Sequence, residues 1–182
     1  MQWTIPGTTL TGQRENADRV DGLFQSLFLA GGLSLSQVSK ITGLEPYTIQ
    51  NWVKRGFLPS PQNKRYDMEQ VCRLINLNFL KGNLTLDQTV QRMGYLTGTL
   101  ADESDDLVDD TMLFFLFDSL AARARYIGGT KAWDDALMES TEDYVEPVPG
   151  ARDKLIKVLK IMLTIWCANA LKAQAKAMME QL

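Results

Sequence analysis

Two short apolar-striped segments, each with its own start and stop signals, constrain the fold of this 182-residue chain most strongly. Ser34 and Gln37 have the spacing of a capping box, which predicts a helix that ends before Gly43. Pro46 is tolerated in the first turn of a helix, so a second helix is expected from there until Gly56. Two short helices joined by a glycine turn predict a helix-turn-helix.

The second of these helices has two chemically different faces. Ile49, Trp52 and Val53 recur at helical spacing and form the apolar stripe that we expect to be buried. The outward positions are polar, basic or aromatic: Tyr47, Thr48, Gln50, Asn51, Lys54 and Arg55. Amide side chains can bridge the N6 and N7 atoms of adenine, and an arginine can fork onto guanine or phosphate. The pattern favours DNA binding, with a protein-binding face or a plain structural face as its alternatives.

The segment that follows, residues 57–66, contains two prolines, and this composition predicts a turn or a small hairpin. Its tip is polar and basic: Asn63, Lys64 and Arg65. A second capping box at Asp67 predicts a helix to about Lys81, and a third at Thr85 predicts another short helix. The expected order is therefore helix, helix, hairpin, helix, helix.

Helical patterns continue on both sides of this region. An apolar stripe over residues 17–30 predicts a helix within an N-terminal part, residues 1–33, that packs on the rest. Small and acidic residues around 97–106 indicate a boundary between a domain at 34–100 and a helical domain at 101–182. We therefore predict an all-α fold, a winged helix-turn-helix with a small β-hairpin wing followed by a helical domain.

Charge is distributed unevenly along the chain, whose formal net charge is −3. Residues 34–100 contain eight basic and four acidic side chains, whereas residues 101–182 contain nine basic and fifteen acidic ones. A net-negative charge taken alone argues against binding to nucleic acid. The basic middle region is nevertheless suited to phosphate contacts.

The residue types present argue against several kinds of chemistry. The chain contains no histidine, and it lacks a glycine-rich phosphate loop and a G-x-S-x-G motif, so we expect neither an enzyme nor a cofactor site. Cys72 and Cys167 have no partner at metal-ligand spacing, which predicts small core residues, no metal site and a reducing, cytoplasmic compartment. The first residues show no signal-peptide pattern. Residues 155–171 are apolar but shorter than the roughly 20 residues of a membrane span, so we expect a buried helix and no membrane partner.

Residues 35–96 resemble the N-terminal domain of MerR-type winged helix-turn-helix regulators. The shared features recur in order: the Thr42-Gly43 turn, the Thr48-Ile49 helix start, Trp52, Gly56 with Leu58-Pro59, Tyr66 and Gly82. The resemblance implies a transcription regulator whose DNA contacts fall on the second helix and on the wing. Those positions correspond here to Gln50, Asn51, Lys54 and Arg55, and to Asn63, Lys64 and Arg65.

The chain also departs from that family. Gln50 and Asn51 stand where many members carry Arg and Tyr, so base preference cannot be transferred. The pattern lacks both a long dimerising helix directly after the fourth helix and the cysteine-bearing loop of the metal sensors, so metal sensing is unsupported. The arrangement as a whole is closer to an uncharacterised bacterial family that pairs a MerR-like half with its own helical domain.

We expect the second half to provide dimerisation, partner binding or the sensing of a small-molecule or protein effector. The nearly all-round apolar segment 155–171 predicts a homodimer. Residues 112–117, with Trp133 and Trp166, are interpreted as core or dimer packing, with an effector pocket as the alternative. One acidic set is interpreted as a solvated linker whose negative charge stabilises the positive N-terminal end of the next helix. The alternatives are that this set binds a cation or masks the basic half. That set is Asp102, Glu103, Asp105, Asp106, Asp109 and Asp110.

The prediction that combines these patterns is a sequence-specific regulator that binds double-stranded DNA. Two alternatives stay open. One is a non-enzymatic adaptor or anti-regulator that uses the winged fold to bind protein, and the other is an excisionase-like architectural protein that bends DNA.

Overall fold

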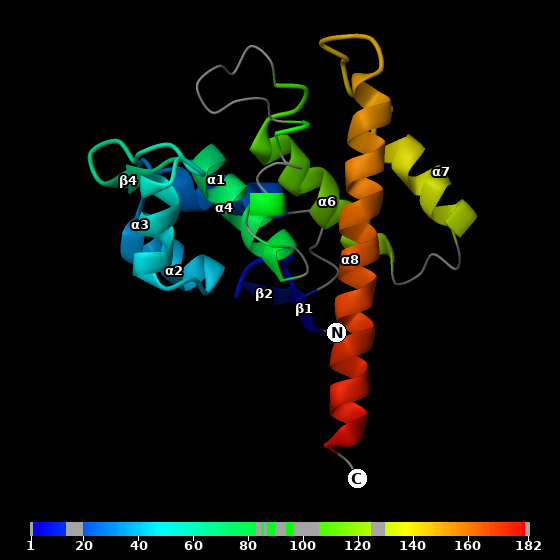
Figure 1. Ribbon diagram of the computed structural model, residues 1–182, viewed down its shortest axis with the longest axis horizontal. Coiled ribbons are helices and arrows are strands. Elements are labelled where there is room, and N and C mark those ends of the chain that lie inside the picture. The colour runs from blue at the N-terminus through cyan, green and yellow to red at the C-terminus, as the bar shows by residue number, and fades with distance from the viewer. Residues whose placement is uncertain are drawn as a thin grey trace.

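The computed structural model describes residues 2–13, 20–82, 85, 87–89, 94–96, 106–124 and 130–180. Helices dominate these residues, and two small antiparallel sheets accompany them (Figure 1), which confirms a mainly α-helical class with a small hairpin. In chain order the elements are β1 (Gln2–Thr4), β2 (Thr11–Gln13), α1 (Val20–Phe28), β3 (Leu33–Ser34), α2 (Leu35–Thr42), α3 (Pro46–Lys54), β4 (Arg65–Tyr66), α4 (Met68–Lys81), α6 (Asp110–Ala124), α7 (Thr130–Ser140) and α8 (Ala151–Met179). Figure 1 shows α2, α3 and β4 at one side of the molecule and α7 at the other, with α4, α6 and α8 between them.

Helices α2 and α3 begin and end where the local signals predicted. The Ser34 amide donates to Gln37 Oε1 at 2.9 Å, and the Gln37 amide donates to Ser34 Oγ at 3.4 Å, which is the predicted capping box. Gly43 follows α2 with φ 68°, a left-handed conformation in which a glycine ends a helix without steric cost. Pro46 is the first residue of α3, and Gly56 follows its end with φ 73°.

The segment after α3 forms the predicted hairpin, whose second strand pairs with a strand that precedes α2. Leu33 lies opposite Tyr66 and Ser34 opposite Arg65 in the antiparallel pair of β3 and β4. The turn residues Asn63 and Lys64 both have positive φ, 50° and 62°, as a two-residue type I′ turn requires. Sequence reasoning missed β3, because its two residues carry no strand pattern of their own.

Helix α4 holds this segment in place from the other side. Its predicted cap is present, since the Gln70 amide donates to Asp67 Oδ1 at 2.8 Å. Gln70 Nε2 also donates to the Ser60 carbonyl oxygen at 3.2 Å, and Arg73 Nε donates to the Phe57 carbonyl oxygen at 3.0 Å. The path from α3 to β4 is therefore fixed by side chains of α4.

The N-terminal residues form a small hairpin that packs against α2 and α4. Strand β1 pairs with β2, and the turn between them contains Gly7 with φ 73°. A Cβ atom on Gly7 would lie 2.7 Å from the Ile75 carbonyl oxygen, so only glycine allows this close approach. Asn78 Nδ2 donates to the carbonyl oxygens of Gly7 and Thr42, at 3.1 and 2.9 Å, which ties the hairpin to α2 and α4. Of the helix predicted at 17–30, residues 17–19 lie outside the described residues, and α1 runs from Val20 to Phe28, two residues short of the predicted end.

A single buried apolar cluster extends from Ile5, through α4 and α6, to Leu163 in α8. The rings of Phe79 and Phe117 lie 4.7 Å apart between centroids and join α4 to α6. Phe114 is also fully buried, which places most of the aromatic stretch of α6 in the core. Residues 97–105, where the boundary between two domains was expected, lie outside the described residues.

A buried ion pair reinforces the contact between α4 and α6. Arg73 Nη1 donates to Asp110 Oδ2 at 2.8 Å, and the side chains are only 8% and 3% exposed. Asn76 Nδ2 donates to Asp110 Oδ1 and to the Asp110 carbonyl oxygen, both at 3.1 Å. Burial raises the pKa of the Asp110 carboxyl, and the charge of Arg73 opposes that rise. Asp110, expected in a solvated linker, is thus part of the core.

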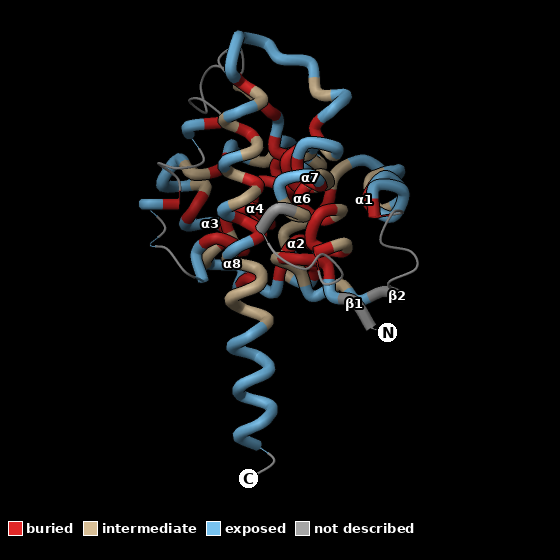
Figure 2. Tube along the Cα trace, turned by 90° about the vertical axis from the view of Figure 1, so that its right-hand side faces the viewer, coloured by how far each residue is buried: buried red, intermediate tan, exposed pale blue. Residues whose placement is uncertain are grey.

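Helix α8 packs on the core with its first half only. Leu155, Leu159 and Met162 are fully buried, whereas the helix from Leu171 to Glu180 is exposed and projects from the body (Figures 1 and 2). The expectation of a buried helix at 155–171 was wrong at its end, since Leu171 is 66% exposed. The apolar pattern does not distinguish a face covered by this chain from one left uncovered. No helix among the described residues has the length and apolar character needed to cross a membrane.

Candidate nucleic-acid interface

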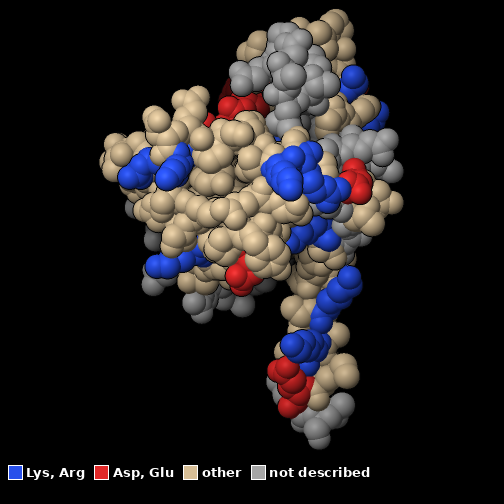
Figure 3. All heavy atoms as spheres, turned by 60° about the vertical axis from the view of Figure 1, so that its left-hand side comes forward, with Lys and Arg blue, Asp and Glu red and all other residues tan. Residues whose placement is uncertain are grey.

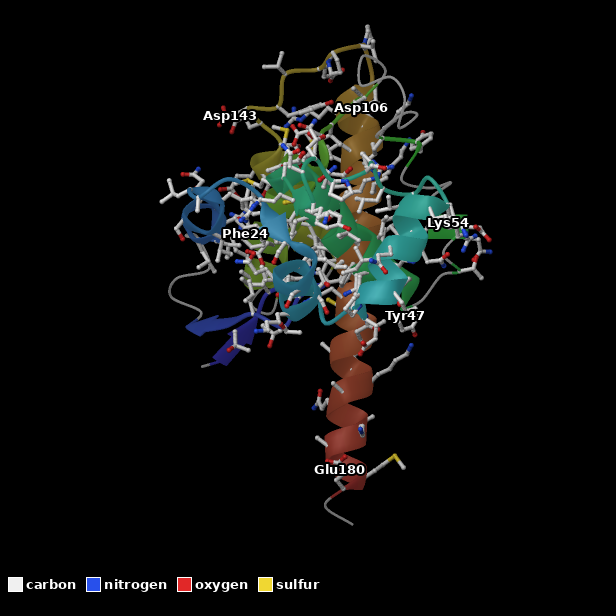
Figure 4. The ribbon with its side chains drawn as sticks, turned by 90° about the vertical axis from the view of Figure 1, so that its left-hand side faces the viewer. Phe24, Tyr47, Lys54, Asp106, Asp143 and Glu180 are labelled. Atoms are coloured by element: carbon white, nitrogen blue, oxygen red, sulfur yellow. The ribbon has the colours of Figure 1, made fainter. Side chains whose placement is uncertain are left out.

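Helix α3 separates its two faces as the sequence pattern predicted. Ile49 and Trp52 are buried and anchor the helix in the core, and Val53 is half-buried. The opposite face is open to solvent and carries Tyr47, Gln50, Asn51, Lys54 and Arg55. Tyr47 is 71% exposed, and Figure 4 shows Tyr47 and Lys54 on either end of the helix. Thr48 was expected to face outward, but its side chain is half-buried.

The hairpin presents its polar tip to solvent. Asn63, Lys64 and Arg65 are all exposed. Arg65 Nη1 donates to the Gly32 carbonyl oxygen at 2.9 Å, which holds this guanidinium beside the strand pair. Helix α2 contacts both α3 and β4, so the exposed face of α3 and the basic tip are carried by one local scaffold (Figure 1).

Two further charged side chains lie near the C-terminal end of α3, and sequence reasoning did not include them. Lys81 Nζ lies 5.3 Å from the centroid of the Trp52 ring, and burial lowers the pKa of this lysine. Asp87 Oδ1 accepts a hydrogen bond from Arg55 Nη2 at 2.7 Å. Both contacts join residues more than 25 positions apart in the chain, so no local motif could have revealed them.

On the face that Figure 3 displays, the basic side chains of the described residues do not form one continuous surface. Figure 3 shows Lys and Arg in separate groups on the face that it displays, with a few Asp and Glu between them. Such spacing suits contacts with individual phosphates along a backbone better than a uniform attraction to any polyanion. The formal net charge of −3 also argues against a uniform attraction to polyanions.

The cysteines and acidic residues offer little for metal binding within the described chain. Cys72 and Cys167 are both free thiols, and burial raises the pKa of each. Among the described residues, no three Cys, Asp or Glu side chains gather closely enough to hold a metal ion. Asp102, Glu103 and Asp105 of the predicted acidic set lie outside the described residues.

A pocket of about 500 Å³ lies where the N-terminal end of α6 meets the segment before α8. Glu69, Asp106, Asp109 and Asp143 contribute carboxylates to its wall, and Tyr144 contributes an aromatic ring. Figure 4 shows Asp106 and Asp143 at the same end of the molecule. Asp109 Oδ1 accepts a hydrogen bond from the Met112 amide at 2.7 Å, so this carboxylate caps α6 as the sequence indicated.

A family model described as a domain of unknown function (DUF1836) matches residues 29–113. The matched region begins just before β3, contains α2, α3, β4 and α4, and ends within α6. It therefore includes the exposed face of α3, the hairpin tip and the Arg73–Asp110 ion pair. The searches of curated proteins and of solved structures gave no match.

Proposed function

We propose that this protein binds double-stranded DNA in a sequence-specific manner and acts as a transcription regulator of the MerR-like type. The observation that carries the proposal is the construction of α3. Its apolar face is anchored by Ile49 and Trp52, and its outward face presents amide and basic side chains beside an exposed basic hairpin tip. A helix of this width enters the major groove, where side chains reach the base edges.

The order of elements supports a winged helix-turn-helix. Strand β3 leads into α2, the Gly43 turn leads into α3, and the hairpin returns through β4 to pair with β3. In this arrangement α3 is the recognition helix and the hairpin is the wing. The similarity of residues 35–96 to MerR-type regulators agrees with this assignment.

The side chains then divide into two roles. Gln50 and Asn51 read base edges, because their amides both donate and accept hydrogen bonds. The phosphate contacts come from the charged and hydroxyl side chains around them: Tyr47, Thr48, Lys54, Arg55, Lys64 and Arg65, with Asn63 at the wing tip. Each neutralised phosphate adds about 0.9 to the slope of log K against log salt concentration.

We also propose that the protein forms a homodimer through α8. Six residues of the exposed face repeat at alternating steps of three and four: Ile161, Thr164, Ala168, Leu171, Ala175 and Met178. This is the seam of a two-stranded coiled coil, and an antiparallel pairing places Leu171 of one copy opposite Ala168 of the other. The same pairing places Ile161 opposite Met178 and Thr164 opposite Ala175. Residues 161–180 span about 30 Å of helix, a length over which two copies of α8 can pair.

The acidic second half contains a pocket that we propose as a regulatory site. The pocket beside Asp109 and Tyr144 is large enough for a small effector, and it borders Glu69 at the start of α4. Because α4 holds the segment that leads to the wing, a ligand in the pocket is placed to influence the DNA-binding half.

The proposal is tested with the full-length chain by selecting bound duplexes from a random library and then measuring fluorescence anisotropy at two salt concentrations. Gln50→Ala should weaken binding to the selected sequence by about 1–3 kcal/mol and leave binding to a scrambled duplex nearly unchanged. Gln25→Ala is the matched control, since Gln25 is exposed on α1 away from α3. Equal losses on both duplexes would contradict base reading by Gln50. The absence of salt-sensitive binding to any duplex would reject the function itself and favour a protein partner.

A further inference from the structure

The side chain of Arg55 is held at the end of α3 by two neighbours. Its guanidinium carbon lies 4.3 Å from the centroid of the Phe57 ring, and Nη2 donates to Asp87 Oδ1 at 2.7 Å. An arginine stacked on a ring and bonded at one edge loses less side-chain freedom when it binds a second group. Arg55 is therefore preordered before any ligand arrives.

The ion pair of Arg55 and Asp87 is open to solvent. The two side chains are 42% and 76% exposed, so the carboxylate can move away at little cost. A carboxylate and a phosphate present the same kind of paired oxygen acceptors to a guanidinium. The position of the Asp87 carboxylate is thus a position that an incoming phosphate could take.

The surroundings favour an anion at this place. Arg55 follows directly after Lys54, the last residue of α3, whose outward face carries the proposed base-reading residues. Lys81 Nζ lies 5.3 Å from the ring centroid of Trp52, three positions before Arg55 on α3. The Phe57 amide donates to the Trp52 carbonyl oxygen at 2.9 Å, which connects the segments that carry the two rings.

We propose that the Asp87 carboxylate occupies the position of a DNA backbone phosphate on Arg55, and that Asp87 competes with DNA for Arg55. The inference rests on the proposed DNA-binding function and assigns Asp87 a role in limiting affinity for DNA of any sequence. Binding then exchanges one anion for another, so Arg55 contributes less to affinity than an unpaired arginine would.

The exchange predicts the effect of removing the competing charge. Asp87→Asn keeps the shape of the side chain and should raise DNA affinity about two- to fivefold, the range expected for release of an exposed ion pair. It should also steepen the slope of log K against log salt concentration by up to about 0.9, because Arg55 is no longer neutralised within the protein.

The experiment is a double-mutant cycle by fluorescence anisotropy on the full-length chain, with a scrambled duplex and a selected duplex. Asp87→Asn is measured alone and with Arg55→Ala, and circular dichroism checks that each variant is folded. Asp135→Asn, an exposed carboxylate on α7, is the control for a general change in net charge. The expected result is a gain with Asp87→Asn on both duplexes, no gain when Arg55 is already Ala, and no gain with Asp135→Asn.

Two results would overturn the inference while leaving the DNA-binding proposal intact. One is unchanged or weaker binding by Asp87→Asn. The other is an equal gain in the presence of Arg55→Ala, which would mean that Asp87 acts through net charge alone. If the wild-type chain and all variants fail to bind DNA, the proposed function is rejected and the inference is rejected with it.

Discussion

The Arg73–Asp110 ion pair makes a strong prediction about stability. Asp110→Ala removes the carboxylate that accepts hydrogen bonds from Arg73 at 2.8 Å and from Asn76 at 3.1 Å. The Arg73 side chain, which is only 8% exposed, then loses the carboxylate that it contacts at 2.8 Å. Breaking one side of a buried pair costs about 3–5 kcal/mol, so we expect a loss of that size in the free energy of unfolding.

The assay is urea unfolding of the full-length chain followed by far-UV circular dichroism, with the midpoint and slope compared between variants. Asp134→Ala is the control, because it breaks the Asp134–Lys160 pair, whose side chains are 52% and 44% exposed. That exposed pair should contribute about 0.2–1 kcal/mol. A difference of less than 1 kcal/mol between the two variants would refute the reasoning that burial determines the cost.

A second comparison separates the buried charge from the loss of packing. Arg73→Met combined with Asp110→Leu removes both charges and retains apolar volume. It should therefore destabilise less than Asp110→Ala alone, since both charges of the ion pair are removed together. If the double variant is as unstable as the single one, packing and the lost hydrogen bonds of Phe57 and Asn76, and not the charge, explain the loss.

Two further predictions concern the α8 seam and the hairpin tip. Light scattering at micromolar concentration should give a mass of twice the 20.5 kDa of the chain. Leu171→Lys places a charge on the coiled-coil seam and should give a monomer. Ala173→Lys lies off the seam and should remain a dimer. A monomeric wild-type chain would reject the dimer. Lys64→Gly should raise the free energy of unfolding by about 0.5–1 kcal/mol, because Lys64 has φ 62°, and should weaken DNA binding with a slope lower by about 0.9. Unchanged DNA binding by this variant would remove Lys64 from the phosphate contacts.

Much of the local structure around the candidate site followed from short-range patterns. The capping boxes at Ser34 and Asp67 are present as predicted, and Thr85 and Gln88 exchange the same pair of contacts, at 3.1 and 3.3 Å. These signals work because both partners belong to one turn of helix, so no distant part of the chain is needed to form them. The same holds for the outward face of α3, which Trp52 and the helical period specify together.

What the sequence determined by itself was therefore the type, order and limits of α2, α3 and α4, and the division of α3 into a buried and an exposed face. Only the tertiary structure placed Asp110 in the core, paired β3 with β4, and brought Asp87 to Arg55. It also left Leu171 uncovered, although its helix is as apolar as a buried one. The physical reason is range: caps and turns are stabilised by residues three or four positions apart, whereas strand pairing, buried ion pairs and the covering of an apolar face depend on segments that only the folded chain brings together.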